Sequence, residues 1–352
     1  MLSLIKDFRW SLAVTFLGFA LAFAWGFNKG GMNMAFAALT IAAILSVMEV
    51  SLSFDNAVVN AGVLKDMDEK WQQLFLTVGI LIAVFGMRLV FPLLIVAIAT
   101  SQGMIEVAQM ALSKPDEYSA HLTDAHVGIA AFGGMFLLLV FLNFMFDNEK
   151  ELHWLGFIER KLSFFGKLDM VTVLISISVL LAFQTILPES DRLVAMLAGS
   201  SGILLYIAVD SLSSLFNEES KGDAEIVSES IKRNGLMGFI YLEILDASFS
   251  FDGVIGAFAI TRDVVIIMIG LMIGAMFVRS MTVYLVKKGT LDEYIFLEHG
   301  AHYAIGVLAF IMLTSMVYHV PEVITGLVGV AFIVASVISS IAHKKNNPES
   351  VA

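Results

Sequence analysis

Residues 34–64 read MAFAALTIAAILSVMEVSLSFDNAVVNAGVL, and this stretch decides what kind of fold the chain can have. Its apolar run is longer than the roughly 20 residues that cross a bilayer as a helix. It also contains Glu49 and Asp55, although a carboxylate in a membrane helix costs at least about 2.5–3.5 kcal/mol. We therefore expect a membrane span that is broken or strongly tilted and whose acids have a function.

The composition of the whole chain agrees with a membrane protein. Of its 352 residues, 58% are hydrophobic and 15% charged, against about 45–50% and 25% in soluble domains. The chain has no cysteine, which excludes disulfides, thiolate metal sites and a catalytic thiol. Its net charge of −11 argues against a nucleic-acid partner. The lipid bilayer is the expected surrounding.

The hydropathy pattern predicts an all-α polytopic bundle of about ten transmembrane helices. The expected spans are 11–27, 34–64, 74–99, 127–146, 169–187, 193–216, 236–260, 263–286, 301–318 and 321–342. We expect one membrane domain, with the first repeat in 1–168 and the remaining spans, including the second repeat, in 169–352. The first span could instead be a cleaved signal peptide, with Ala22-Phe23-Ala24 as its processing motif.

The distribution of basic residues sets the orientation. With ten spans and a cytoplasmic N-terminus, fifteen of the 21 Lys and Arg residues fall on the cytoplasmic side and four on the outer side. The remaining two, Arg88 and Arg279, lie within spans. The positive-inside rule therefore predicts that both termini lie in the cytoplasm.

A second copy of the opening motif indicates an internal repeat. Residues 246–257 read DASFSFDGVIGA, which aligns with 49–60 so that acids, serines and the Phe-Asp pair coincide. Arg88 and Arg279 follow in the next span of each half, and Ala-His pairs open the span after that, at His126 and His302. Matched spans are five apart, so they cross in opposite directions. The chain is predicted to hold two inverted-topology repeats of five spans, a design common in transporters.

The repeated acids are candidate metal ligands. They are expected near the midplane of matched spans. A site with oxygen ligands and no thiolates suits Mn²⁺, Ca²⁺ or Mg²⁺. The candidate ligands are Glu49, Asp55, Asn56, Asp246 and Asp252. The supporting ligands or ion-pair partners are Ser53, Ser250, Glu243, Asp210, Arg88 and Arg279. His126 and His302 are candidate proton carriers, although interfacial polar residues are an alternative.

The spacing of the acids bears on the local structure. Glu49, Ser53 and Asn56 share one helical face, but Asp55 lies about 120° from Glu49 around an unbroken helix. Either the polar face is broad or the helix unwinds near Asp55 and Asn56, which would expose carbonyl oxygens to a cation. An alternative for all these acids is that they pair with Arg88 and Arg279 and only hold the bundle together.

The motifs Leu-Ser-Phe-Asp55-Asn56-Ala and Phe-Ser-Phe-Asp252-Gly253 resemble the TerC family of integral membrane proteins, and more closely a branch of that superfamily known only as conserved membrane proteins. The resemblance covers about residues 34–320. It implies a bacterial inner-membrane protein related to manganese exporters and linked by name to tellurium resistance, with Glu49, Asp55, Asn56, Asp246 and Asp252 as metal-handling residues. Gly253 departs from the pattern, since Asn56 stands at the matching place in the first half.

Three functions are compatible with these features. The first is a divalent-cation transporter, with Mn²⁺ export favoured by the resemblance and antiport as a natural driving force. The second is a non-transporting scaffold of a metal or tellurium stress-response complex, and the third is an ion-coupled exporter of a small solute. No phosphate loop or hydrolase motif is present, so we do not expect an enzyme. Candidate partners besides lipid and metal are a second copy of the chain and stress-complex proteins.

Overall fold

The computed structural model describes residues 8–65, 67–147, 150, 152–165, 170–217, 235–318 and 320–346. The side chains of a few residues within these ranges, including that of Asp252, are not described. Within the described ranges the chain is helical and has no strand. The helices are α2 (Arg9–Leu52), α3 (Phe54–Leu64), α4 (Glu69–Leu81), the π-helix η1 (Ile82–Val90), α5 (Phe91–Thr100), α6 (Met104–Ser113), α7 (Pro115–Asp124), α8 (His126–Phe146), α9 (Gly156–Phe165), α10 (Val171–Ile186), α11 (Glu189–Asn217), α13 (Gly235–Ile260), α14 (Val264–Lys288), α15 (Thr290–Glu293), α16 (Leu297–Ser315) and α17 (Glu322–Asn346).

The helices confirm an all-α polytopic bundle. Seven helical stretches in the described part of the chain are long and apolar enough to cross a membrane. The first of them, α2, bends back on itself, because Gly30 and Gly31 have non-helical backbone angles and Gly31 has a φ of 70°. Because α2 covers two of the predicted spans, these seven stretches account for eight of the ten. The other two predicted spans correspond to α10, which is shorter, and to α13. Each of the ten predicted segments therefore coincides with a helix, with a half of α2 or with a run of consecutive helices.

The long second segment is broken, as its length suggested. Helix α2 ends at Leu52 and α3 begins at Phe54, with Ser53 between them at φ −107° and ψ 17°. The Ser53 N–H still bonds to the Glu49 carbonyl at 3.0 Å, so the break is a kink of a single residue. It places Asp55 in the first turn of α3, where the helix dipole favours a negative charge.

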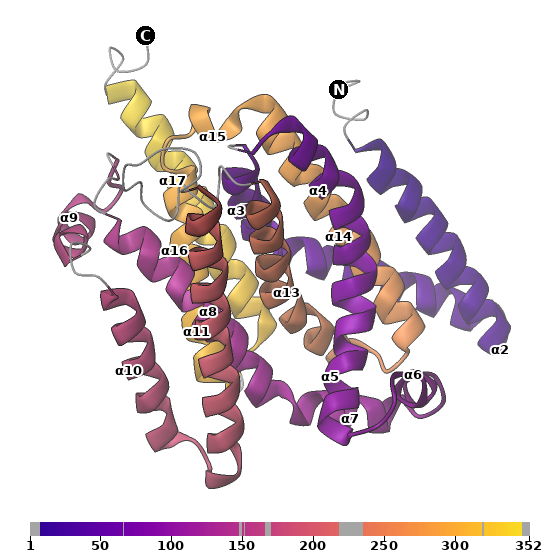
Figure 1. The fold of residues 1–352 in the computed structure, drawn as a ribbon. Coiled ribbons are helices and arrows are strands. Elements are labelled where there is room, and N and C mark those ends of the chain that lie inside the picture. Colours follow the sequence, from indigo (N-terminus) through magenta and orange to yellow (C-terminus); the bar gives the residue numbers. More distant parts are fainter. Residues whose placement is uncertain are drawn as a thin grey trace.

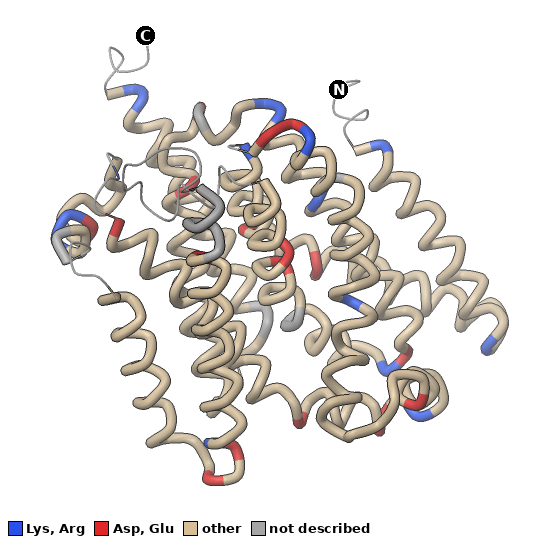
Figure 2. The backbone as a smooth tube through the Cα atoms, in the orientation of Figure 1, with Lys and Arg blue, Asp and Glu red and all other residues tan. Residues whose placement is uncertain are grey.

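The helices alternate in direction between two faces of the bundle (Figure 1). We call the face where α2 begins and α17 ends the terminal face, and the other the opposite face, where α6 and α7 lie. The half of α2 after its bend passes mostly across the bundle, and α3, which follows it, runs toward the terminal face, whereas α13 runs away from that face (Figure 1). The two matched motifs therefore cross in opposite directions, as the inverted repeat predicts. Figure 2 shows basic residues at several helix ends on the terminal face.

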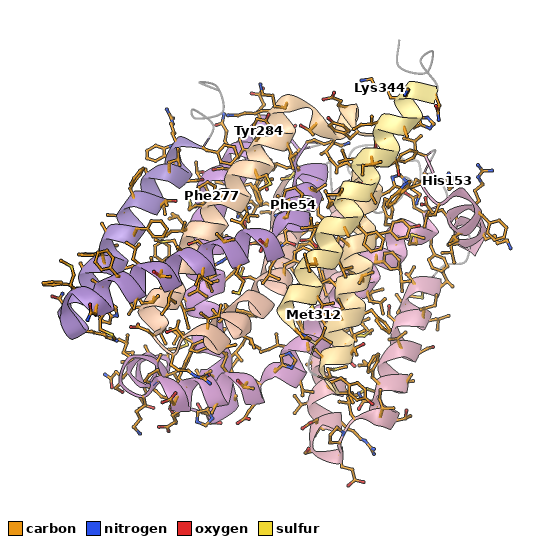
Figure 3. The ribbon with its side chains drawn as sticks, turned by 180° about the vertical axis from the view of Figure 1, so that it is seen from behind. Phe54, His153, Phe277, Tyr284, Met312 and Lys344 are labelled. Atoms are coloured by element: carbon orange, nitrogen blue, oxygen red, sulfur yellow. The ribbon has the colours of Figure 1, made fainter. Side chains whose placement is uncertain are left out.

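Close packing of α2 on α14 forms the centre of one half of the bundle. A Cβ on Gly270 would come within 2.5 Å of Leu45 Cβ, and one on Gly274 within 2.5 Å of Glu49 Cβ. The Gly-x-x-x-Gly spacing lets two membrane helices approach at backbone distance. Ser11, in the first half of α2, also donates to the Met276 carbonyl at 2.8 Å. The first predicted span is therefore packed into the bundle, as the back view of Figure 3 shows.

Three of the regions between the predicted spans contain helices. The region 101–125 contains α6 and α7, and the region 147–168 contains α9. Glu298 and His299, between the predicted spans 263–286 and 301–318, lie in the first turn of α16. Most of the region 217–235 lies outside the described residues.

Candidate functional site

Glu49 is held by the kink and by an arginine from the next span. Arg88, on η1, donates from Nη2 to Glu49 Oε1, and Ser53 Oγ donates to the same oxygen at 3.2 Å. Arg88 Nη1 donates to the Ala83 carbonyl at 2.6 Å. Glu49 and Arg88 are both buried, at 1% and 6% exposed. A buried carboxylate is thus neutralised within the first repeat.

Arg88 also reaches the second repeat. Its Nη1 lies 4.0 Å from Asp246 Oδ2, on α13. Asp246 is the residue that the sequence alignment matches to Glu49, so one guanidinium lies between the two matched acids. This contact joins the two repeats at their buried centre.

A second arginine pair lies nearby and repeats the first. Arg279 Nη2, on α14, lies 3.2 Å from Glu243 Oε1, on α13. The guanidinium of Arg279 also stacks over the ring of Phe75 at 3.6 Å. Each repeat therefore contributes one pair between its motif span and the following span. The pairing of acids with Arg88 and Arg279 that the sequence left open is present, but with Glu243 as the partner of Arg279.

Glycines bring the neighbouring helices against these acids. A Cβ on Gly253 would lie 2.7 Å from Glu49 Oε2, and a Cβ on Gly79 would lie 2.6 Å from Glu243 Oε1. Asp55 in turn faces Gly329 of α17, where a Cβ would lie 3.2 Å from Asp55 Oδ2. Gly253, which the alignment of the two repeats matches to Asn56, is thus the point at which α13 passes Glu49.

Asp55 differs from the other buried acids. It is 6% exposed, and no ion pair reaches it among the described residues. Its Oδ1 accepts the backbone N–H of Asn56 at 3.1 Å. On the same short helix, the side-chain oxygens of Asn56 and Asn60 are buried without a hydrogen-bond partner in the described part of the chain.

The centre as a whole holds more acid than base. Its described members are four buried acids (Glu49, Asp55, Glu243, Asp246) and two buried arginines (Arg88, Arg279), an excess of two negative charges if all are ionised. Glu243 Oε2, Asp246 Oδ2 and Ser250 Oγ also have no hydrogen-bond partner among the described residues. Buried polar atoms in native proteins are nearly always satisfied, by protein, water or an ion. These oxygen atoms therefore mark places for such a species.

The described acids do not close around one point. Among the residues described here, no three His, Asp or Glu side chains come together tightly enough to hold a metal ion. The ligand set expected from the sequence is divided instead between the two arginine pairs and Asp55. Asp252, its fifth member, has a side chain outside the described residues, so the complete set stays a prediction.

Two cavities lie next to residues of the centre. One, of about 320 Å³, is lined by residues near the terminal face, including Val59 on α3 and His302 on α16. Val59 is one helical turn beyond Asp55. The other cavity, of about 240 Å³, is lined mainly by apolar residues of α5 to α7, α13 and α14, with Arg88 in its wall. Arg88 thus borders one cavity directly, and the other cavity begins one helical turn beyond Asp55.

Three predicted supporting residues lie away from the centre. His126 approaches Ser315 Oγ at 3.4 Å, near the end of α16 on the opposite face. His302 bonds through Nδ1 to the Glu298 carbonyl at 2.9 Å, near the start of α16, and stacks on Phe144 at 3.8 Å. The matched histidines are therefore about 20 Å apart along α16. Asp210 lies on α11, half-buried and one turn from Tyr206.

A cluster that the sequence reasoning missed lies at the terminal face. Glu159 on α9 is fully buried, and its Oε2 lies 3.0 Å from Lys150 Nζ and 3.5 Å from His299 Nε2. Its Oε1 accepts the Leu155 N–H at 2.9 Å and the Tyr303 hydroxyl at 3.1 Å. No repeat marks this acid, and only the alternation of polar and apolar residues in 150–165 could have suggested it.

The fold and the centre define an α-helical membrane protein with buried carboxylate–arginine pairs at the junction of two inverted repeats. The chain belongs to the family described as "Protein of unknown function (DUF475)", which matches residues 54–347. It is also 29% identical to "Uncharacterized membrane protein YceF" of Bacillus subtilis (strain 168) over 143 residues, which cover 37% of this chain and 54% of that protein. The chain thus spans about half the length of this relative. No solved structure matches the chain.

These matches correct the family expected from the sequence. The assignment to the TerC family is wrong, since the family that matches is a different one. The TerC resemblance rested on short acid motifs. Short Ser-x-Asp patterns carry too little information to distinguish one membrane-protein family from another. Manganese and the export direction, which that resemblance favoured, lose that support. The argument from oxygen ligands does not depend on it.

Proposed function

We propose that this protein transports a divalent cation across the membrane through the buried carboxylate centre, with Asp55 as the residue that takes up and releases the ion. The observation that carries the proposal is the excess of two negative charges among the buried acids and arginines described above. An uncompensated carboxylate is costly in a membrane interior, so such an excess calls for bound cations or protons. A divalent ion would balance it.

The chemistry around Asp55 supports a hard cation. Oxygen atoms that could bind a cation come from its carboxylate, from the amide oxygens of Asn56 and Asn60, which have no hydrogen-bond partner among the described residues, and from the backbone at the Ser53 kink. Mn²⁺, Ca²⁺ and Mg²⁺ prefer such ligands, and the chain has no thiolate to favour Zn²⁺ or Cu⁺. The arginine pairs hold Glu49 and Glu243 while the site is empty, and a rearrangement of the two halves would bring further acids to the ion. Access would alternate between the two cavities.

The alternative of a scaffold is favoured by the arginine pairs themselves. Arg88 with Glu49, and Arg279 with Glu243, are buried ion pairs that could serve only to fix the helices. A small-solute exporter is the third candidate, and the cavity of about 320 Å³ is at the lower end of the size range of small-molecule sites.

The test is ion flux into proteoliposomes. Wild-type protein, Asp55→Asn and the matched variant Asp210→Asn would be reconstituted with a metal-sensitive dye inside and Mn²⁺, Ca²⁺ or Mg²⁺ outside. We expect flux in the wild type and in Asp210→Asn, and loss of most flux in a folded Asp55→Asn. Equal behaviour of all three proteins, or no flux of any of these ions, would favour the scaffold.

A further inference from the structure

Helix α9 lies outside the main bundle, near the terminal face. It is seen almost end-on in Figure 1, whereas the neighbouring α10 and α11 run along the bundle. It therefore lies across the direction in which the spans cross the membrane. A short helix in this position belongs at the membrane surface, with one side against the protein.

One side of α9 is fixed to the bundle by Glu159. The contacts of Glu159 with Lys150, His299 and Tyr303 come from the chain before α9 and from α16. Leu162, one turn further along α9, packs on the cluster formed by Leu142, Met145 and Phe146 of α8. These contacts decide which residues α9 turns away from the bundle.

The outward side of α9 is both apolar and basic. Phe157 is 75% exposed and Ile158 is 49% exposed. Arg160 and Lys161 are exposed beside them, and Lys161 Nζ lies 4.0 Å above the ring of Phe157. The acid of α9, Glu159, faces inward and is already balanced by Lys150. The outward side therefore presents two positive charges next to two large apolar side chains.

We propose that this outward side of α9 binds the headgroups of anionic phospholipids. Phe157 and Ile158 enter the boundary between headgroups and acyl chains, and Arg160 and Lys161 bind the phosphate groups of the same lipids. Apolar side chains combined with Lys and Arg are the pattern of helices that bind anionic membrane surfaces. A basic side chain close to such a surface enriches anionic lipid about fivefold, so two such side chains give an enrichment on the order of 25-fold.

The opposite face offers a contrast within the same molecule. Helix α6 exposes Ile105 by 76%, but its neighbour is Glu106 and the following α7 begins with Asp116 and Glu117. This surface also exposes apolar side chains, but its acids outnumber Lys114 and Arg262, the two basic residues that pair with Glu117 and Asp116. It should show no preference for anionic lipid.

The contacts of Glu159 connect α9 to a cavity inside the bundle. Glu159 joins α9 to Lys150 and His299, and both of these residues line the cavity of about 320 Å³. An anionic lipid that holds α9 in place therefore also holds part of the wall of this cavity.

The absence of cysteine permits a direct test. A single cysteine at Ile158→Cys, or at Ile105→Cys as the control, would carry an environment-sensitive fluorophore in the full-length protein. The labelled protein would be placed in symmetric bilayers of phosphatidylglycerol and phosphatidylcholine, with brominated acyl chains on only one of the two lipids. The ratio of quenching by the two brominated lipids gives the local preference at the label.

We expect the label at position 158 to prefer phosphatidylglycerol at least about fivefold at low salt, with the preference reduced as salt is added. Arg160→Gln/Lys161→Gln should abolish the preference. Lys344→Gln/Lys345→Gln, which removes the same charge from the end of α17, should leave it unchanged. Equal quenching by both lipids in the parent protein would overturn the proposal, as would a label that neither lipid quenches, since α9 would then face water.

Discussion

Arg88 bonds to Glu49 in its own repeat while its other terminal nitrogen lies 4.0 Å from Asp246 in the second repeat. One guanidinium therefore lies between the two acids that the internal repeat matches. The second repeat has no equivalent bridge among its described contacts, because Arg279 binds Glu243, one turn away from Asp246. The pseudo-symmetry of the sequence thus becomes an asymmetric ion-pair network.

Replacement of Arg88 should destabilise the protein strongly. In Arg88→Gln, Glu49 and Asp246 lose their positive partner in a buried site, and loss of one member of a buried pair costs about 3–5 kcal/mol. Denaturant unfolding in detergent would measure the change. The double variant Arg88→Gln/Glu49→Gln should recover part of the loss. A double variant as unstable as the sum of its two single variants would show that the pair is not coupled.

Asp55→Asn should have a much smaller effect on stability. No ion pair reaches Asp55 in the described part of the chain, and the amide can still accept the Asn56 N–H, so we expect a change within about 1 kcal/mol. The same unfolding measurement, made beside Arg88→Gln, checks this. A loss as large as that of Arg88→Gln would mean that Asp55 is a structural residue.

Gly274→Ala should separate α2 from α14. The new Cβ would lie 2.5 Å from Glu49 Cβ and 2.9 Å from the Ser46 carbonyl oxygen, and the latter belongs to the backbone and cannot turn aside. Overpacking of this kind costs about 1–3 kcal/mol. Gly86→Ala is the matched control, since its nearest atom, Ile82 Cγ2, would be at an ordinary 3.4 Å. Thermal unfolding of the two variants should differ clearly, and similar melting temperatures would contradict this close approach.

The docking of α9 should fail in acid. Burial alone would raise the pKa of Glu159, but the Leu155 N–H, Lys150 and His299 outweigh it and hold the pKa below its usual value. A carboxyl with a lowered folded-state pKa stabilises the docked form above the unfolded pKa, near 4.5, and loses this contribution as pH falls through the folded value. Limited proteolysis of the 150–165 region across pH would follow the release of α9. In Glu159→Gln, α9 should already be more accessible to protease at neutral pH, and the dependence on acid should be weaker.

The sequence predicted the helices well and the centre only in part. The ten apolar segments, the kink near Asp55 and the opposite directions of the matched spans could all be expected from span length and from the repeat. The partner of Arg279 could not, because Glu243 and Asp246 are one turn apart and only the rotation of α13 decides which of them comes within ion-pair distance of Arg279. The Glu159 cluster was missed because its members come from two distant stretches of chain, 150–159 and 299–303. The family was misassigned because the shared motifs are short.

By itself the sequence determined that this protein is a helical membrane protein with an inverted repeat and buried acids. Hydropathy, span length and the sorting of Lys and Arg are properties of each segment alone, so they can be read without knowing how the segments meet. Only the tertiary structure decided that Arg88 lies between Glu49 and Asp246, that Asp55 has no arginine partner among the described residues, and that α9 turns its basic side outward. These relationships depend on how each helix is rotated and how closely glycines such as Gly253 and Gly274 let two helices approach. Such contacts between distant segments are set by packing in three dimensions.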